Sequence, residues 1–100
     1  MTAIFKAPGR SPDLIQIEPN PSAIRKKLGG DYETVPVLKG AMLLCRKDDR
    51  TLPFNVHLMG GTYGGPILLV GRGQDDAMVD LKQQLQIMLT MVLSQKESKR

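Results

Sequence analysis

The chain has 100 residues, enough for one domain with a single hydrophobic core. Its formal net charge of +4 comes from 14 Lys and Arg against 10 Asp and Glu, a balance that favours solubility and weak attraction to polyanions over a dedicated nucleic-acid surface. One cysteine excludes an internal disulfide and a cysteine-rich zinc site, and the few aromatic residues offer little stacking surface for single-stranded nucleic acid.

Two short strands are expected at the start of the chain, at Ala3–Ala7 and Leu14–Glu18. In the second, Ile15 and Ile17 alternate with polar residues, which is the pattern of a half-buried strand. Residues 8–13 combine proline, glycine and aspartate in the manner of a turn, so the two strands should form a hairpin.

A short helix is expected next. Asn20 can cap its first turn, Pro21 suits the first helical position, and Gly29 suits the end. Because this helix has barely two turns, packing of Ile24 and Leu28 on a sheet must hold it in place.

A second pair of strands is predicted at Tyr32–Leu38 and Ala41–Arg46. Pro36 cannot donate to a ladder, so it places the first of these at a sheet edge or gives it a bulge. The second is apolar on both faces and should lie nearer the centre.

The central strand is expected at Ile67–Val70, a short run of branched residues between Pro66 and Gly71. Such a run fits a strand that is covered on both faces. Residues 51–58 are expected to form a loop or a single helical turn, and the glycine-rich residues 60–65 a loop that leads into the central strand.

The last predicted element is a long C-terminal helix that begins after a breaker and cap at residues 73–76. Its docking stripe follows a spacing of 3, 4, 3 and 4 and consists of Met78, Leu81, Leu85, Met88 and Val92. From Ile87 to Leu93 the helix is apolar nearly all round, which predicts contact with a second subunit. The expected interface residues are Ile87, Met88, Met91 and Val92.

The chain is thus predicted to be α+β, with a mainly antiparallel sheet of about five short strands, one short helix and a long C-terminal helix. A single domain is expected over residues 1–95, with a disordered basic tail at 96–100. The N-terminus lacks the apolar core of a signal peptide, and no apolar run is long enough to span a membrane. We therefore expect a cytoplasmic protein without membrane contact.

Catalysis has one candidate pair, Cys45 as nucleophile and His57 as base. Cys45 stands at the end of an apolar strand, however, and a cysteine in that position more often serves as a small buried hydrophobic residue. One His and one Cys are also too few for a metal site, because the adjacent pairs Asp48-Asp49 and Asp75-Asp76 are better explained as a turn and a cap. The sequence therefore predicts no enzyme activity, no cofactor and no metal.

The glycine-rich residues 60–65 do not form a nucleotide fingerprint, because they precede a strand instead of opening a helix. Two interpretations stay open: a flexible connection, or a loop that presents Thr62, Tyr63 and bare amides to a ligand or partner. The dispersed basic groups are either a solvated face or phosphate contacts. Candidate ligand- or partner-binding residues are Arg25, Lys26, Asn55, Gly61, Thr62, Tyr63 and Gly64.

Several short motifs follow one another along the chain in an order and at spacings that match the pattern of a known family. They are Pro8-Gly9, Leu28-Gly29-Gly30, Thr34-Val35-Pro36, Leu43-Leu44-Cys45, Leu52-Pro53-Phe54-Asn55, Gly61-Thr62 and Leu69-Val70-Gly71. Over roughly residues 4–71 the chain resembles a family of domains of unknown function carried by Firmicutes and by their phages, plasmids and conjugative elements. The long C-terminal helix and the doubled glycines depart from that pattern. The resemblance implies a habitat on mobile elements and no particular reaction.

The leading interpretation is a small non-enzymatic binding module of a phage or mobile element that acts as a homo-oligomer. A host protein or a small anionic ligand is its expected partner, because a glycine-rich loop with scattered Arg and Lys suits an anion. The alternative is a sequence-independent nucleic-acid-binding accessory protein, suggested by the basic charge.

Overall fold

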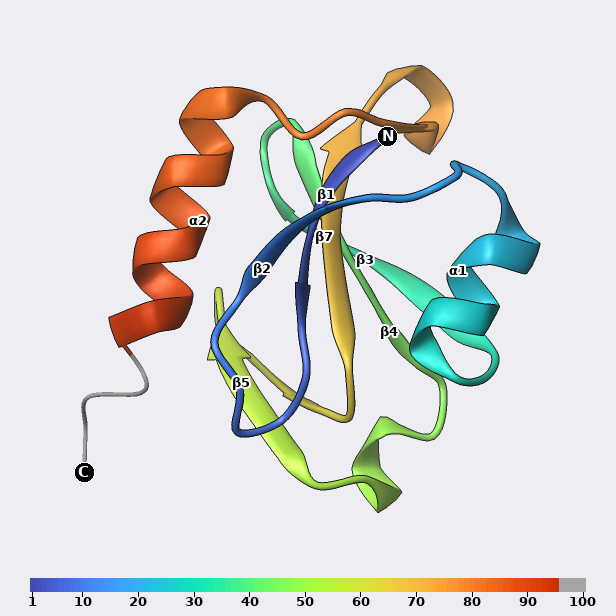
Figure 1. The fold of residues 1–100 in the computed structure, drawn as a ribbon, viewed down its shortest axis with the longest axis vertical. Coiled ribbons are helices and arrows are strands. Elements are labelled where there is room, and N and C mark those ends of the chain that lie inside the picture. Colours follow the sequence, from blue (N-terminus) through green and yellow to red (C-terminus); the bar gives the residue numbers. More distant parts are fainter. Residues whose placement is uncertain (96–100) are drawn as a thin grey trace.

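The structure is a computed structural model that describes residues 1–95 of the chain. It has an α+β fold in which a helix lies to either side of an antiparallel sheet (Figure 1). The elements in chain order are β1 (Thr2–Lys6), β2 (Asp13–Gln16), α1 (Pro21–Leu28), β3 (Tyr32–Leu38), β4 (Ala41–Arg46), the 3-10 turn η1 (Asp49–Thr51), β5 (Phe54–Leu58), β6 (Gly61–Gly64), β7 (Ile67–Arg72), the 3-10 turn η2 (Gln74–Asp76), β8 (Met78–Val79) and α2 (Gln83–Gln95). The predicted fold class is confirmed.

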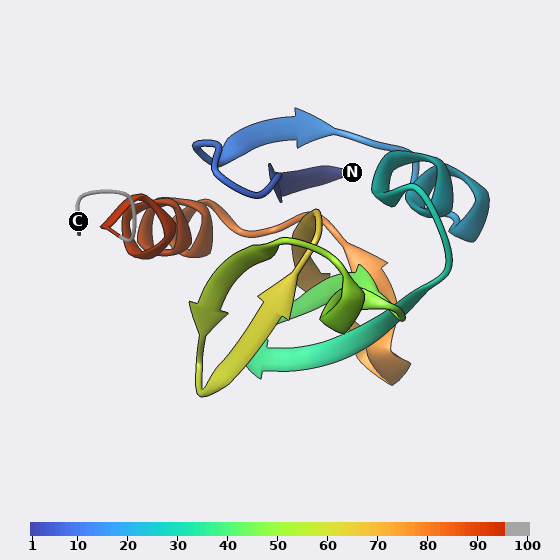
Figure 2. The ribbon, with the colours of Figure 1, turned by 90° about the horizontal axis from the view of Figure 1, so that it is seen from below.

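The main sheet has the order β2-β1-β7-β4-β3, with every neighbouring pair antiparallel, and β8 extends it by pairing with the end of β7. Strands β5 and β6 form a separate two-stranded sheet (Figure 2). β5, β6 and β8 are additional to the five strands that the sequence predicts, because they lie in segments where a loop or a helix was expected.

β7 is the centre of the molecule, as predicted. Ile67 and Leu69 face the core that α2 and the β5–β6 hairpin cover, while Leu68 and Val70 face the core that α1 covers. All four side chains are fully buried. At 25 cal/mol per Å² of apolar surface, each such side chain contributes roughly 1.5–3 kcal/mol of burial free energy.

Helix α1 begins and ends at the capping residues that the sequence predicts. The side chain of Asn20 accepts a hydrogen bond of 2.8 Å from the N–H of Ala23, and Gly29 ends the helix in the left-handed region with a φ of 86°. Ile24 and Leu28 are buried against the sheet. The predictions for Pro36 are also confirmed, since β3 is an edge strand whose register shifts beside it.

The β5–β6 hairpin replaces the two loops predicted for residues 51–58 and 60–65. Met59 and Gly60 both have positive φ, 49° and 83°, and make the tight turn between the strands. The prolines and glycines of this segment are typical of loops, so the sequence did not predict the strands. The two strands pair because Val56 and Leu58 are buried in the core, and local β-propensity contributes little.

The C-terminal helix begins later than predicted, and the predicted docking stripe is correct only in part: Leu81 is buried and Leu85 and Val92 pack against the core. Residues 74–79 form η2 and β8, so Met78 belongs to a strand and packs on the α1 side. In α2 itself Leu89 and Leu93 are fully buried, whereas Met88 is 39% exposed and does not dock. The helix starts late because residues 78–79 pair with Gly71 and Arg72 of β7, and the chain passes so close that an added Cβ at Gly71 would overlap the carbonyl oxygen of Asp80. The predicted tail at 96–100 lies outside the described residues.

Candidate functional site

Two neighbouring hollows adjoin η1 and β6. They have volumes of about 490 and 550 Å³ and share Asp49, Arg50, Thr62 and Tyr63 as walls. The first is completed by Leu52, Phe54 and Gly64, and the second by Glu33, Cys45, Lys47, Asp48 and Thr51. We call the two together the η1–β6 cleft. Their sizes fall in the range of small-molecule sites.

The walls of the η1–β6 cleft are held by two glycines of β6. The N–H of Gly64 donates a hydrogen bond of 3.3 Å to Oδ2 of Asp49, and an added Cβ at Gly64 would overlap the carbonyl oxygen of Asp49. An added Cβ at Gly61 would overlap the hydroxyl of Tyr63. Gly64 therefore permits the close packing of η1 against β6, and Gly61 leaves room for the Tyr63 side chain beside it.

Burial and nearby carboxylates raise the pKa values of two groups of the cleft, Cys45 and Tyr63. Burial, followed by the charges of Asp49 and Glu33, raises the pKa of the Cys45 thiol to about 11. Burial also raises the pKa of Tyr63, with smaller contributions from Cys45, Asp49 and Glu33. At neutral pH the thiol is protonated, which removes the thiolate that a nucleophilic cysteine needs.

His57, the candidate base, differs from the Cys45 thiol in its exposure to solvent and in the residues that it contacts. Cys45 is 1% exposed and belongs to the core, whereas His57 lies on the exposed surface of β5. Nδ1 of His57 is 2.8 Å from Oγ1 of Thr62, and its ring packs against Phe54 with 4.9 Å between centroids. The described contacts of His57 thus fit a surface cluster on the hairpin.

Of the predicted ligand-binding residues, Thr62, Tyr63 and Gly64 line the cleft, and Gly61 sits beside Tyr63. Asn55 has a different place. It is 5% exposed, its Oδ1 accepts a bond of 2.8 Å from Nζ of Lys6, and its Nδ2 donates to the carbonyls of Lys6 and Gly65. Asn55 therefore joins β5 to the end of β1 and to the connection between β6 and β7.

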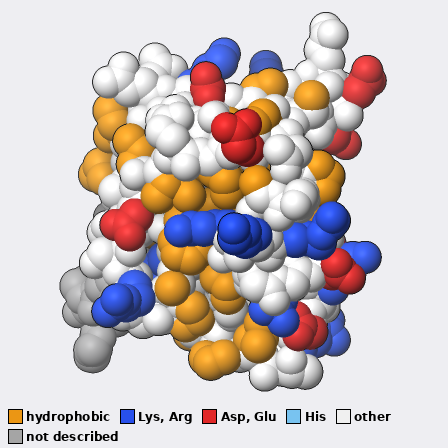
Figure 3. All heavy atoms as spheres, turned by 45° about the vertical axis from the view of Figure 1, so that its right-hand side comes forward, with side chains coloured by type: hydrophobic (Ala, Val, Ile, Leu, Met, Phe, Trp, Pro, Cys, Tyr) orange, Lys and Arg blue, Asp and Glu red, His pale blue; other side chains and the backbone are white. Residues whose placement is uncertain are grey.

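Arg25 and Lys26 are exposed on α1, which packs on the other face of the main sheet from the β5–β6 hairpin. The neighbouring Lys27 lies over the ring of Phe5, 4.4 Å from its centroid. In Figure 3, which brings the α1 side forward, Lys and Arg side chains alternate with acidic and hydrophobic ones. The structure therefore does not unite these basic residues with the η1–β6 cleft.

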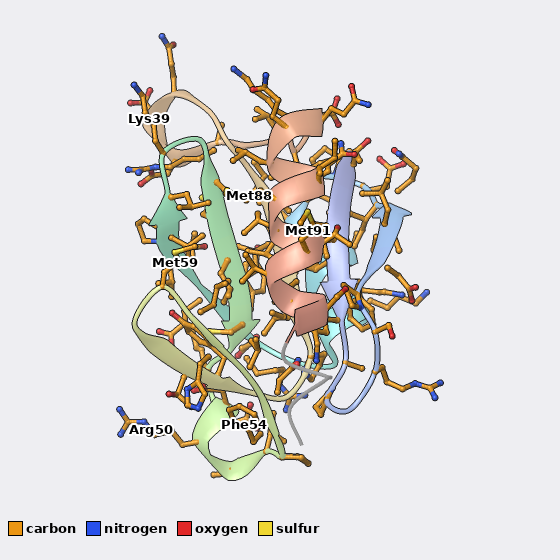
Figure 4. All side chains as sticks on the ribbon, turned by 90° about the vertical axis from the view of Figure 1, so that its left-hand side faces the viewer. Lys39, Arg50, Phe54, Met59, Met88 and Met91 are labelled. Atoms are coloured by element: carbon orange, nitrogen blue, oxygen red, sulfur yellow. The ribbon has the colours of Figure 1, made fainter. Side chains whose placement is uncertain are left out.

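A second surface feature lies on α2. Ile87 and Met91 are 56% and 58% exposed, and Met88 also faces solvent, while Val92 is half-buried. Figure 4 shows Met88 and Met91 on this helix. Ile87 and Met91 line an apolar groove of about 410 Å³ whose other walls are Pro12, Leu14, Gln86 and Thr90. We call Leu14, Ile87, Met88 and Met91 the α2 apolar face.

Comparison with known families gives one finding. The model of a family described as a domain of unknown function, DUF3846, matches residues 1–93. The chain belongs to this family. No curated protein and no solved structure matches it. The match extends beyond the range 4–71 of the motif resemblance and takes in most of α2, so the helix lies within the DUF3846 domain.

Both the η1–β6 cleft and the α2 apolar face therefore lie within the DUF3846 domain. Among residues 1–95 no group of three or more His, Cys, Asp or Glu is placed to hold a metal ion. No helix in that same range is long and apolar enough to cross a membrane.

Sequence reasoning missed Glu33, Asp49 and Phe54 as cleft residues. The segment from Arg46 to Arg50 looked like a solvated charged turn, and nothing local distinguishes Asp49 within it. Glu33 reaches the site because β3 pairs with β4 so that Glu33 lies opposite Cys45. A predicted register for that hairpin is the one signal that could have found it.

Proposed function

We propose that this DUF3846 protein is a small non-enzymatic interaction module that works as a homodimer joined through the α2 apolar face. The observation that carries the proposal is the exposure of three large apolar side chains on one helix, next to Leu14 of the β1–β2 hairpin. Single exposed apolar residues are common, but a contiguous group beside a groove is typical of an interaction site.

The energetics favour a second copy as the occupant. Ile87, Met91 and Leu14 each forgo part of the roughly 1.5–3 kcal/mol that full burial of such a side chain provides. A two-fold axis beside α2 would bury these side chains on both subunits at the same time. Symmetric dimers are the commonest assemblies. Two methionines in the patch can also adapt their shape to a partner.

The remaining elements of the proposal depend on other observations. The non-enzymatic role is supported by the protonated state of the buried Cys45 thiol. A setting on a phage or mobile element, in the host cytoplasm, rests on the motif resemblance. A host protein is a further partner that the same apolar face could accept. A small anionic ligand would need the exposed basic end of α1.

The test is the mass of the native particle. Wild-type protein should elute as a dimer in light scattering at tens of micromolar, and the double substitution I87K/M91K should elute as a monomer with unchanged circular dichroism. V79K is the matched control, because Val79 is 42% exposed but lies on β8 outside the patch. A monomeric wild-type protein, or a dimer that survives I87K/M91K, would contradict the proposal.

The alternative of nucleic-acid binding has one supporting observation, the basic last turn of α1 with Arg25, Lys26 and Lys27. The mixed charge of that surface in Figure 3 weakens it. A salt titration separates the alternatives, because nucleic-acid affinity falls steeply with salt in proportion to the phosphates neutralised. R25E/K26E should abolish such binding, and it should leave the dimer intact.

A further inference from the structure

The main sheet ends in β3 on one side and in β2 on the other, and these two edges are built differently. β3 carries Pro36, which has no N–H to donate, and its register shifts beside that proline. Such features keep an edge from pairing with another strand. β2 pairs with β1 in continuous register and has no proline or lysine within Asp13–Gln16. The β2 edge is therefore the one that can accept a further strand.

The main-chain groups on the open side of β2 follow from its pairing with β1. The N–H of Ile17 donates to the carbonyl of Met1, and the N-terminal nitrogen of Met1 donates to the carbonyl of Ile17, both at 2.9 Å. Residues that exchange both bonds recur at every second position of an antiparallel ladder, so Ile15 also faces β1. Leu14 and Gln16 consequently point their N–H and C=O groups away from β1. Among residues 1–95 no strand pairs with these groups.

The side chains at this edge are apolar on both faces of the sheet. Ile15 is half-buried on the α1 side. Leu14 is 58% exposed on the α2 side, where it lines the groove with Ile87 and Met91. In Figure 4 helix α2, with Met91 labelled, lies beside the blue strands β1 and β2. The β2 edge and the α2 apolar face therefore adjoin, and a strand added to β2 would cover the exposed side of Leu14.

We propose that the homodimer of the proposed function, on which this proposal rests, is joined by antiparallel pairing of β2 with β2 of a second copy. The two main sheets then form one continuous sheet, and the two-fold axis is perpendicular to it. An axis in that direction keeps α2 of both subunits on the same face of the sheet, so their apolar residues meet over the seam. The paired strands supply main-chain hydrogen bonds, and the side chains beside them supply buried apolar surface.

The groups available on the chain select one register. Pro12 has no N–H, and the carbonyl of Glu18 already accepts a hydrogen bond of 2.9 Å from an N–H in the turn before α1. Leu14 and Gln16 are left, and they complement each other across a two-fold axis at Ile15. Leu14 then pairs with the partner's Gln16, and Gln16 pairs with the partner's Leu14. Each pair exchanges both of its main-chain hydrogen bonds.

This register also suits a second copy in charge and in shape. Asp13 lies opposite the partner's Ile17, and Glu18 lies opposite the partner's Pro12, so like charges do not face each other. Ile15 lies opposite the same residue of the partner and extends the apolar surface that α1 covers. A second copy is therefore complementary to the β2 edge in its hydrogen bonds, its charges and its apolar side chains.

The first test removes one main-chain donor. Because the N–H of Gln16 points away from β1, Gln16→Pro leaves the β1–β2 ladder intact and deletes the bond to the partner's Leu14 twice in each dimer. The dissociation constant of the dimer should rise at least tenfold. Gln16→Thr is the matched control. It also loses the side-chain bond to Thr2, but it keeps the N–H and should dimerise like the wild type. Light scattering over a dilution series measures both variants, and circular dichroism checks that they fold.

A cross-link locates the two-fold axis. Residues opposed at a position without hydrogen bonds have Cα atoms about 4.5 Å apart, which is within the range of a disulfide. Ile15→Cys should therefore form a covalent dimer under mild oxidation. Ile17→Cys is the control, because the two copies of residue 17 lie at opposite ends of the seam and should stay unlinked. The native Cys45 is 1% exposed and does not compete for the bond.

Separate outcomes decide the strand pairing and the α2 contact. Dimerisation of Q16P at wild-type strength, or equal cross-linking of I15C and I17C, would overturn the strand pairing. If I87K/M91K still abolished the dimer in that case, the α2 contact would stand. A dimer that Q16P weakens and I87K/M91K leaves intact would support the strand pairing and contradict the α2 contact. If Q16P does not fold, the cross-link of I15C decides, and a monomeric wild-type protein overturns both proposals.

Discussion

The two helices of this protein use their apolar residues differently. Helix α1 has two buried apolar residues, Ile24 and Leu28, and the side chains of its last turn are basic. Helix α2 buries Leu89 and Leu93 on the other face of the sheet and still carries Ile87 and Met91 more than half exposed. A helix that serves only the fold has as many apolar residues as one face can bury. The surplus on α2 is the basis of the proposed dimer contact.

The largest expected effect tests which stripe of α2 belongs to the core. Leu89→Ala should lower the free energy of unfolding by about 2–5 kcal/mol, because it leaves a cavity under a fully buried side chain. Ile24→Ala should cost a similar amount on the α1 side. Met91→Ala should change the stability of the monomer by no more than about 0.5 kcal/mol. Urea denaturation at low protein concentration measures all three.

A stability loss for Met91→Ala that equals the loss for Leu89→Ala would show that both sides of α2 are packed within one subunit. The comparison between the helices would then fail, and the dimer proposal with it. If the effect of Met91→Ala grows with protein concentration, the contact is between subunits, because the stability of a dimer depends on mass action.

Predictability from sequence also differs between the two sides of the sheet. For α1, Asn20, Pro21 and Gly29 mark the ends, and the structure places the helix between them. For α2, the spacing of Met78, Leu81 and Leu85 extends a helical pattern into a segment that forms β8 and the connection to the helix. Periodicity alone cannot exclude this, because the pairing of β8 with β7 depends on close approach of the chain to Gly71.

The candidate sites follow the same division. Ile87 and Met91 were identified correctly as residues left over from the core, because surplus hydrophobicity is visible in the sequence. The cleft was found only in part, through Thr62, Tyr63 and Gly64. Its carboxylates are brought in from β3 and η1, and no local pattern encodes that meeting.

A smaller effect is expected at Gly64, on the hairpin that covers the α2 side. Gly64→Ala should cost about 1–3 kcal/mol, since its Cβ would meet the backbone oxygens of Asp49 and Leu52, and backbone cannot move aside cheaply. Thr62→Ala on the same strand is the control, because Thr62 is exposed. Thermal melts compare them. Equal melting temperatures would mean that η1 is not fixed by this glycine and that the cleft is not preformed.

The smallest effect concerns the cap of α1. Asn20→Ala should lower stability by about 1 kcal/mol, because the N–H of Ala23 loses its acceptor, and Asn20→Gly should cost only a few tenths. The cap matters here because α1 has eight residues and no acidic residue in its first turn, so little else stabilises its positive end. Chemical denaturation with both variants resolves the difference. If Asn20→Ala costs nothing while Ile24→Ala remains severe, then packing alone defines α1, and the punctuation that located this helix in the sequence contributes nothing to its stability.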